Sequence, residues 1–216
     1  MIEQIVALDR DLTLALNGSH SVLLDALAMI VTSTVAWIPI GLFLHWYVYK
    51  NYGWRTTLLV LGSILLCILV ADTVSSGVFK PLVERWRPSR DPNIMYVVDV
   101  VNEYRGGRYG FFSSHAANTC SVAMFLILLF RSKPLTSLFL LFTLANCWSR
   151  IYLGVHYFGD VVVGLCFGAL VGYCVHKLYV RCGGVHVTDP DGYVLVVNLI
   201  SYVAFLLLAW FLASIF

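Results

Sequence analysis

The chain has 216 residues, of which 60% are hydrophobic and only 12% are charged, and its mean hydropathy is +0.83. A soluble domain has about 25% charged residues, so this composition lacks the polar surface that water requires. It excludes intrinsic disorder, a disulfide-stapled secreted domain and a nucleic-acid-binding protein, and the net charge of +2 points to no particular partner. Apolar runs of nearly 20 residues recur along the chain, which predicts a protein of the lipid bilayer.

The predicted elements are helices throughout. Residues 2–16 place apolar side chains on one helical face, which favours an amphipathic helix lying in the membrane interface, and the turn signal Asn17-Gly18-Ser19 follows. Six membrane-spanning segments are then expected, with Pro39 placed to kink the first, at about 22–49, 56–79, 115–130, 135–152, 158–180 and 193–216. One long polar stretch, 81–114, separates the second segment from the third.

The predicted fold class is therefore all-α: a six-transmembrane-helix bundle with an N-terminal interfacial helix and one long polar loop. No linker or internal repeat interrupts the chain, so residues 1–216 are expected to form a single integral membrane domain. The six cysteines lie in or beside apolar runs without any CxxC or CxxH pair, and we interpret them as apolar packing residues rather than disulfides or metal ligands.

The ends of the expected spans differ in character. The long polar loop and most other polar residues fall on one side, whereas the connections 50–55, 131–134 and 177–192 on the other side contain lysines and arginines. The positive-inside rule places these three connections in the cytoplasm. The polar side has more basic residues in total, but several of them are candidate site residues. We therefore expect a bacterial inner (cytoplasmic) membrane protein whose polar face lies outside the cytoplasm.

The residues suited to catalysis or ligand binding lie in three short segments on that polar face: 80–88, 112–115 and 149–160. Cations and hydroxyls gathered at one membrane boundary suit a phosphate group. His115 and His156 each lie near the start of an expected helix, where free backbone N–H groups favour an anion, and Ser113 and Ser114 are placed to cap the first of these helices.

The histidine at position 156 has a carboxylate nearby. Asp160 follows His156 by four residues, so the two side chains would face the same way on one helical turn. A carboxylate there can accept a hydrogen bond from one ring nitrogen and leave the other free for nucleophilic attack.

These segments resemble the signature of the type-2 phosphatidic acid phosphatase superfamily, which reads Lys-x6-Arg-Pro, then Pro-Ser-Gly-His, then Ser-Arg-x5-His-x3-Asp. The matching residues are Lys80, Arg87, Pro88, Ser113, His115, Ser149, Arg150, His156 and Asp160. The second motif departs at two positions, where Phe112 replaces proline and Ser114 replaces glycine. Three ordered motifs with fixed spacing form a far more specific signal than any one of them alone.

The resemblance implies a membrane lipid phosphatase that needs no metal or other cofactor. His156 would attack phosphorus and form a phosphohistidine, Asp160 would orient that ring, and His115 would protonate the leaving oxygen and then activate water. The phosphate-binding residues would be Lys80, Arg87, Ser113, Ser114 and Arg150. The substrates open to the family are an isoprenoid diphosphate, phosphatidylglycerol phosphate, phosphatidic acid or a phosphorylated glycolipid of the lipid A type.

Asp72 lies inside an apolar run, where ionisable residues are costly and usually functional. Asp72, Ser76 and Lys80 are spaced by four, so Asp72 could support the site through this helix face, or its carboxylate could simply be satisfied by neighbouring hydroxyls. Four further arginines are as compatible with loop solvation or attraction to lipid headgroups as with phosphate binding: Arg85, Arg90, Arg105 and Arg108.

Two other functions remain compatible with these motifs. The same histidine site would serve a phosphotransferase that passes the group to a lipid or sugar, and the cations would serve a non-catalytic carrier of anionic lipids. The soluble vanadium haloperoxidase branch of the superfamily is disfavoured, because lipid-length apolar runs do not suit a soluble bundle. The expected partners are the lipid substrate and the bilayer, and no pattern specifies an oligomeric state.

Overall fold

The computed structural model describes residues 2–19 and 21–188 and, beyond them, only residues 192, 196, 197, 200 and 204. The described residues form helices and loops, with one isolated antiparallel bridge between Trp86 and Tyr109. The expected sixth span, 193–216, lies outside the described residues apart from four isolated positions, and this prediction stays open.

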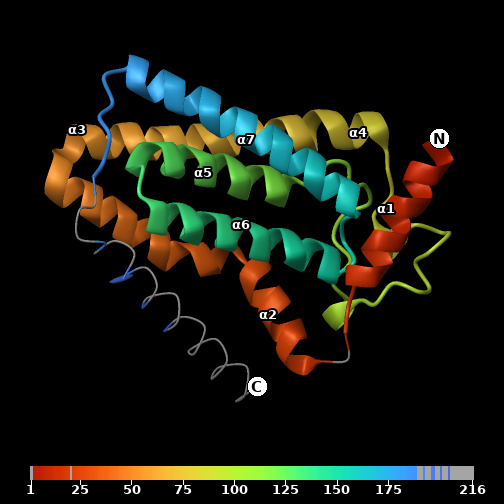
Figure 1. Ribbon diagram of the computed structural model, residues 1–216. Coiled ribbons are helices and arrows are strands. Elements are labelled where there is room, and N and C mark those ends of the chain that lie inside the picture. Colours follow the sequence, from red (N-terminus) through yellow and green to blue (C-terminus); the bar gives the residue numbers. More distant parts are fainter. Residues whose placement is uncertain are drawn as a thin grey trace.

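The chain begins with two helices, α1 (Ile2–Leu16) and α2 (Val22–Thr32), joined at Gly18, whose φ of +64° suits the turn. The long helix α3 (Ile38–Asp72) contains a non-helical Gly53 with φ +76° and ψ 175°, and there the chain reverses direction (Figure 1). A π-helical segment, Thr73–Phe79, continues α3 into the short α4 (Lys80–Val83). The expected loop 50–55 is thus a tight reversal at Gly53.

The first expected span, 22–49, is not one helix. Ser33 ends α2, and its hydroxyl caps a 3₁₀ turn (Thr34–Trp37) by accepting from the backbone N–H of Val35 at 3.3 Å. Pro39 therefore lies in the first turn of α3 and does not kink a continuous helix. A proline is tolerated there because its missing N–H group would have no intrahelical partner.

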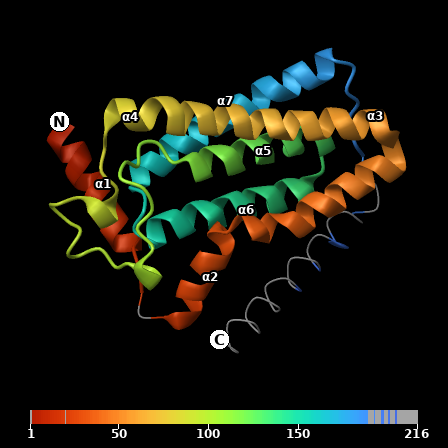
Figure 2. The same ribbon diagram turned by 180° about the vertical axis from the view of Figure 1, so that it is seen from behind.

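Three further helices complete the bundle: α5 (Ser114–Phe130), α6 (Lys133–Tyr152) and α7 (Phe158–Arg181). Their bounds agree with the expected spans to within two residues. The two halves of α3 and helices α5, α6 and α7 run lengthwise beside one another, α2 leans against α6, and α1 lies across one end (Figures 1 and 2).

Helix α7 packs on α5 through a stripe of glycines at spacing four. A Cβ atom on Gly164, Gly168 or Gly172 would lie 2.6, 2.4 or 2.3 Å from a carbonyl oxygen of α5. Only glycine allows the two backbones to approach so closely, as in other tightly packed membrane helices. This packing fixes the start of α7 against the start of α5, and the backbone N–H of Ser113 donates to the carbonyl of Asp160 at 3.0 Å.

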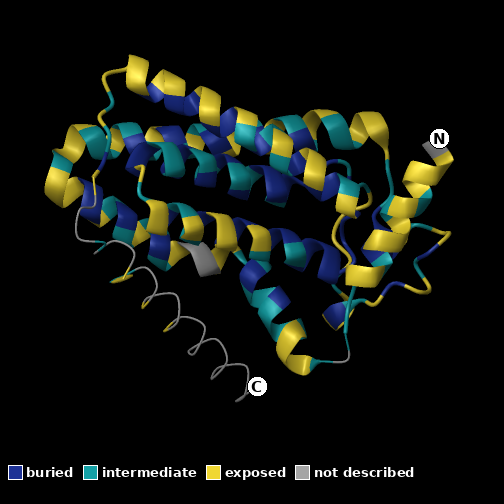
Figure 3. Ribbon diagram, in the orientation of Figure 1, coloured by how far each residue is buried: buried dark blue, intermediate teal, exposed yellow. Residues whose placement is uncertain are grey.

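The outer surface of the bundle is apolar. Buried residues lie on the inward faces of the helices, and exposed residues lie on the outward faces (Figure 3). Large aliphatic residues on these faces, among them Leu42, Leu82 and Leu141, are 67–74% exposed. Two described helical stretches, Ile38–Val83 and Phe158–Arg181, are long and apolar enough to cross a bilayer. Such a surface is suited to lipid rather than water.

Candidate active site

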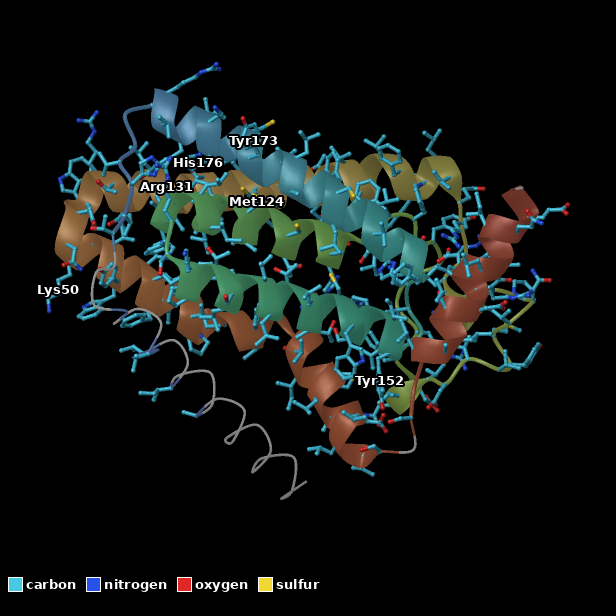
Figure 4. All side chains as sticks on the ribbon, in the orientation of Figure 1. Lys50, Met124, Arg131, Tyr152, Tyr173 and His176 are labelled. Carbon is cyan, nitrogen blue, oxygen red and sulfur yellow. The ribbon has the colours of Figure 1, made fainter. Side chains whose placement is uncertain are left out.

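The candidate site lies at one end of the bundle. The loop 84–113, the first turns of α5 and α7 and the last turn of α6 meet there, beside α1 (Figures 1 and 2). Lys50 and Arg131 mark the opposite end, and Tyr152 lies at the site end (Figure 4). All three sequence motifs therefore converge on the same end, as expected from the sequence.

His156 lies in the loop between α6 and α7 and is fully buried. Its Nδ1 atom faces Asp160, 3.5 Å from Oδ2, and its Nε2 atom lies 3.3 Å from Nη1 of Arg87. The backbone N–H of His156 donates to the carbonyl of Arg150 at 3.3 Å. The ring thus has one nitrogen toward a carboxylate and the other toward a guanidinium.

The sequence argument placed His156 and Asp160 on one helical turn, and this reason was wrong. Helix α7 begins at Phe158, so His156 precedes it, and Asp160 turns back toward the loop as a capping residue. Its Oδ2 accepts from the backbone N–H of Tyr157 at 3.1 Å. The two side chains meet because this cap folds the loop against the helix.

The surroundings of His156 keep its ring neutral. Burial lowers the pKa of His156 well below its ordinary value of 6.5, and the positive charges of Arg87, Arg150 and Lys80, together with His115, lower it further. All four groups therefore lie within electrostatic reach of the ring. Burial, followed by the charge of Arg150, also lowers the pKa of Arg87, to about 10, so Arg87 stays charged at neutral pH.

Lys80 is held by hydroxyl groups. Its Nζ donates to Ser114 Oγ at 3.0 Å and to Ser76 Oγ at 2.9 Å, and Ser76 in turn donates to Asp72 Oδ1 at 3.3 Å. A neighbouring hydroxyl therefore satisfies the carboxylate of Asp72, and the same hydroxyl contacts Lys80. Ser114, which replaces the glycine of the family motif, provides one of the contacts that place Lys80.

Arg150 is 1% exposed, and its guanidinium points toward α2 and the polar loop. It donates to Thr32 Oγ1 and to the hydroxyl of Tyr104 at 3.2 Å, and it lies 5.5 Å from the centre of the Tyr104 ring. Its Nε is buried without a hydrogen-bond partner among the described residues. Thr32 and Tyr104 were not predicted from the sequence.

Two residues of the motif 112–115 also stabilise the local fold. Ser113 caps α5 as expected, because its hydroxyl accepts from the backbone N–H of Ala116 at 3.4 Å. Phe112 is 2% exposed and packs between Phe79 and Phe167, each with a ring centre at 5.2 Å. Phenylalanine at this position therefore fills an apolar cluster beneath the site.

Arg85 is the main site residue that sequence reasoning did not single out. Its guanidinium donates to Asp160 Oδ1 at 2.7 Å and to Asp9 Oδ2 at 2.5 Å. Burial alone would lower the pKa of Arg85, but the two carboxylates raise it above its ordinary value. Arg90 and Arg105 instead donate to loop carbonyls at Gly106 and Ser89, which fits the solvation alternative.

The same architecture occurs in a solved membrane enzyme. The structure is similar to the crystal structure of a transmembrane PAP2 type phosphatidylglycerolphosphate phosphatase from Bacillus subtilis, with a TM-score of 0.63. The match covers 82% of this chain and 87% of that one at 19% identity, and it shows that the fold is shared. Fold and apolar surface together define an integral membrane protein, and the charged end suits phosphate chemistry.

Sequence comparisons define the family. The sequence model of the PAP2 superfamily matches residues 56–183. Lipid A 4'-phosphatases of Bacteroides thetaiotaomicron and Porphyromonas gingivalis are 39% and 35% identical to this chain, over 84% and 82% of its length and 83% and 75% of theirs. The chain belongs to the PAP2 superfamily. The predicted family and the predicted class, a membrane phosphatase acting on lipid, are confirmed.

Proposed function

We propose that this protein removes a phosphate group from a membrane lipid through a phosphohistidine formed on His156. The observation that carries the proposal is a fully buried, neutral imidazole whose Nε2 lies 3.3 Å from a guanidinium group. A neutral ring offers a lone pair for attack, and Arg87 beside it marks the position of an anionic phosphoryl group. Asp160, on the Nδ1 side, holds the ring and stabilises the positive charge that develops on it.

The reaction proceeds in two displacements at phosphorus. In the first, Nε2 of His156 forms a bond to phosphorus while the bond to the lipid oxygen breaks. His115, protonated when the negative phosphate offsets the neighbouring cations, gives that oxygen a proton. In the second, His115 takes a proton from water as the water oxygen attacks phosphorus, and the P–N bond breaks to release inorganic phosphate. The same histidine thus acts first as acid and then as base.

The cations of the site bind the transferred group. Lys80, Arg87 and Arg150 surround the phosphoryl oxygens with positive charge, and Ser113 and Ser114 add hydroxyl and backbone donors at the start of α5. Phosphoryl transfer spreads charge over the equatorial oxygens and depends chiefly on such positioned charge. The buried Nε of Arg150 has no partner among the described residues, and a phosphate oxygen would provide one. Asp72 supports this set through Ser76 and Lys80.

The substrate we propose is the 4'-phosphate of lipid A, because the relatives from Bacteroides thetaiotaomicron and Porphyromonas gingivalis are named lipid A 4'-phosphatases and align over most of this chain. A lipid phosphate lies at the membrane boundary, which is where the bundle presents its charged end. We further propose one domain over residues 1–216 with six spans in the bacterial inner membrane, the site facing outward.

The decisive test is phosphate release by the purified protein from a panel of lipids. Lipid A with both phosphates is expected to lose the 4'-phosphate by mass spectrometry, whereas phosphatidylglycerol phosphate, phosphatidic acid and an isoprenoid diphosphate are expected to react more slowly. His156→Ala is expected to lower turnover by about 10⁴-fold or more, because covalent and acid–base catalysis act together. His45→Ala is the matched control, since His45 lies in α3 and contacts the carbonyl of Gly41.

Two further measurements belong to the same test. Labelled substrate quenched with base should trap an acid-labile phosphoprotein in the wild type and none in His156→Ala. Activity is expected to persist in EDTA, and a loss in EDTA that Mg²⁺ restores would overturn the metal-free mechanism. Faster release from phosphatidylglycerol phosphate than from lipid A would overturn the proposed substrate while leaving the phosphatase assignment intact.

A further inference from the structure

Helix α1 presents its polar side to the protein and its apolar side outward. Asp9, Thr13 and Asn17 are spaced by four and lie along one stripe, and Thr13 is fully buried. Ile5 and Leu8, on the other side, are 61% and 60% exposed. Specific polar contacts therefore hold this helix, beside the apolar contact that Leu14 makes with the cluster of Ile94, Val98 and Tyr157.

Those polar contacts fall on the first turn of α7. The backbone N–H of Gly159 donates to Asp9 Oδ1 at 2.6 Å, and that of Phe158 donates to Thr13 Oγ1 at 2.9 Å. The first N–H groups of a helix have no partner within it, so α1 supplies the caps for α7. A Cβ on Gly159 would lie 3.0 Å from Asp9 Oδ2, so glycine permits this approach.

The second oxygen of Asp9 reaches the candidate site through one arginine. Arg85 donates Nη2 to Asp9 Oδ2 at 2.5 Å and Nη1 to Asp160 Oδ1 at 2.7 Å, so one guanidinium joins two carboxylates. The Arg85 guanidinium also lies 4.1 Å from the ring centre of Tyr157, the residue after His156. Asp160 Oδ2 accepts from the backbone N–H of Tyr157 and also faces Nδ1 of the imidazole at 3.5 Å. Asp9 is thus joined through Arg85 to the carboxylate that lies beside His156.

We propose that Asp9 is a positioning residue for catalysis, acting through Arg85 and the first turn of α7 on Asp160 and His156. This inference rests on the proposed function. With Asp9 present, Arg85 is shared between two carboxylates and contacts only Oδ1 of Asp160, while Oδ2 faces the histidine. Without it, the full charge of Arg85 falls on Asp160, which weakens the hold of Asp160 on the imidazolium that forms during attack. Helix α1 is thereby part of the active site and not only a membrane anchor.

The test compares Asp9→Asn with Asp11→Asn, which removes the same charge from an exposed position of the same helix. In micelles containing lipid A, Asp9→Asn is expected to lower kcat by about 10- to 100-fold with KM within about threefold, because a charge-assisted contact acting in the transition state is lost. Asp11→Asn is expected to match the wild type. Equal kcat values for both variants would overturn the inference.

A double-mutant cycle distinguishes a positioning role of Asp9 in catalysis from a purely structural role in attaching α1 to the bundle. If Asp9 acts through Asp160, then Asp9→Asn in an Asp160→Asn background should cost less than about twofold further in kcat. Equal losses in both backgrounds would show that Asp9 only fastens α1, and would contradict the proposal. Absence of phosphate release by the wild type from every lipid would instead refute the proposed function.

A second variant decides the matter should Asp9→Asn not yield folded protein. Arg85→Lys keeps the positive charge but cannot bridge two carboxylates as a fork does. It is expected to lower kcat by a similar factor, about 10-fold or more, with a melting temperature close to that of the wild type. A kcat equal to that of the wild type would break the proposed link between Asp9 and Asp160.

Discussion

At the scale of single residues, the site end contains two kinds of cation. Arg85 is paired with carboxylates, whereas Lys80, Arg87 and Arg150 form no ion pair with any residue in the described part of the chain. Arg87 and Arg150 are buried and Lys80 is half-buried, and cations removed from water without a counter-charge are unfavourable in the free protein. Their contacts to hydroxyls and carbonyls satisfy hydrogen bonds but leave the charge in place for an anionic substrate.

The same charges determine how the protein responds to acid. An unfolded His156 titrates near 6.5, while in the folded protein its pKa is well below that value, chiefly because of burial. As pH falls below 6.5, the unfolded state binds a proton that the folded state does not, so folding stability contributed by this group falls. We expect the melting temperature to drop more between pH 7.5 and 5.5 in the wild type than in His156→Gln.

Thermal unfolding in one detergent at the two pH values measures this difference. His156→Gln changes the melting temperature at both values, so only the change between them is informative. His45→Gln serves as the control and is expected to show the wild-type drop. An equal drop in His156→Gln and the wild type would mean that His156 is protonated in the folded protein.

The sequence motifs predicted most of the site, and long-range contacts supplied the rest. Lys80, Arg87, His115, Arg150, His156 and Asp160 all come together at one end, because each motif lies at the end of a predicted helix. Asp9 and Arg85 are 76 residues apart in sequence, so no pattern of neighbouring residues could predict their contact. The available signal was the spacing of four between Asp9, Thr13 and Asn17, which places these polar residues on one side of the N-terminal helix and the turn after it.

At the scale of elements, the bounds of α5, α6 and α7 followed from apolar length and capping residues, while the start of α3 did not. The break at Ser33 depends on a serine cap and a 3₁₀ turn. Neither was predicted, because the surrounding residues are apolar enough to suggest one continuous span. The glycine stripe of α7 determines how α5 and α7 pack, and these helices present His115 and Asp160. Packing at the centre of the bundle and geometry at its end are therefore coupled.

This coupling predicts the effect of a single methyl group. In Gly168→Ala the new Cβ would meet the carbonyl oxygen of Ala117 at 2.4 Å, so the two backbones must separate. We expect a loss of about 1–3 kcal/mol in stability from overpacking, and a fall in kcat as α7 moves relative to α5. Melting temperature and lipid A turnover measure the two effects.

Gly62 in α3 provides the matched control, because a Cβ there would meet nothing within 4 Å. Gly62→Ala is expected to be neutral or to stabilise the helix by up to about 1 kcal/mol, since alanine is the better helix former. Equal stability and turnover in the two alanine variants would show that the close approach of α5 and α7 is not needed.

At the scale of the whole molecule, the two ends of the bundle differ in their charged groups. One end contains the three motifs, the polar loop and α1 (Figure 1), and the other contains Lys50 and Arg131 (Figure 4). Arg181 is the last residue of α7. Between the two ends the surface is aliphatic. The positive-inside rule then gives the proposed orientation, with the catalytic end outside the cytoplasm.

Labelling with a membrane-impermeant maleimide checks this orientation. Cys182 is exposed just after α7, at the basic end, and Tyr96 is 85% exposed in the polar loop at the other end. Both proteins to be compared have alanine at the exposed Cys166 and Cys174. The first keeps native Cys182, which is expected to stay unlabelled in intact spheroplasts. The second has Cys182 replaced and Tyr96→Cys added, and the new cysteine is expected to be labelled. Inverted membrane vesicles are expected to give the opposite result, and permeabilised cells should label both. Labelling of Cys182 in intact spheroplasts would place the catalytic end in the cytoplasm, and its lipid phosphate would then have to be presented on the inner leaflet.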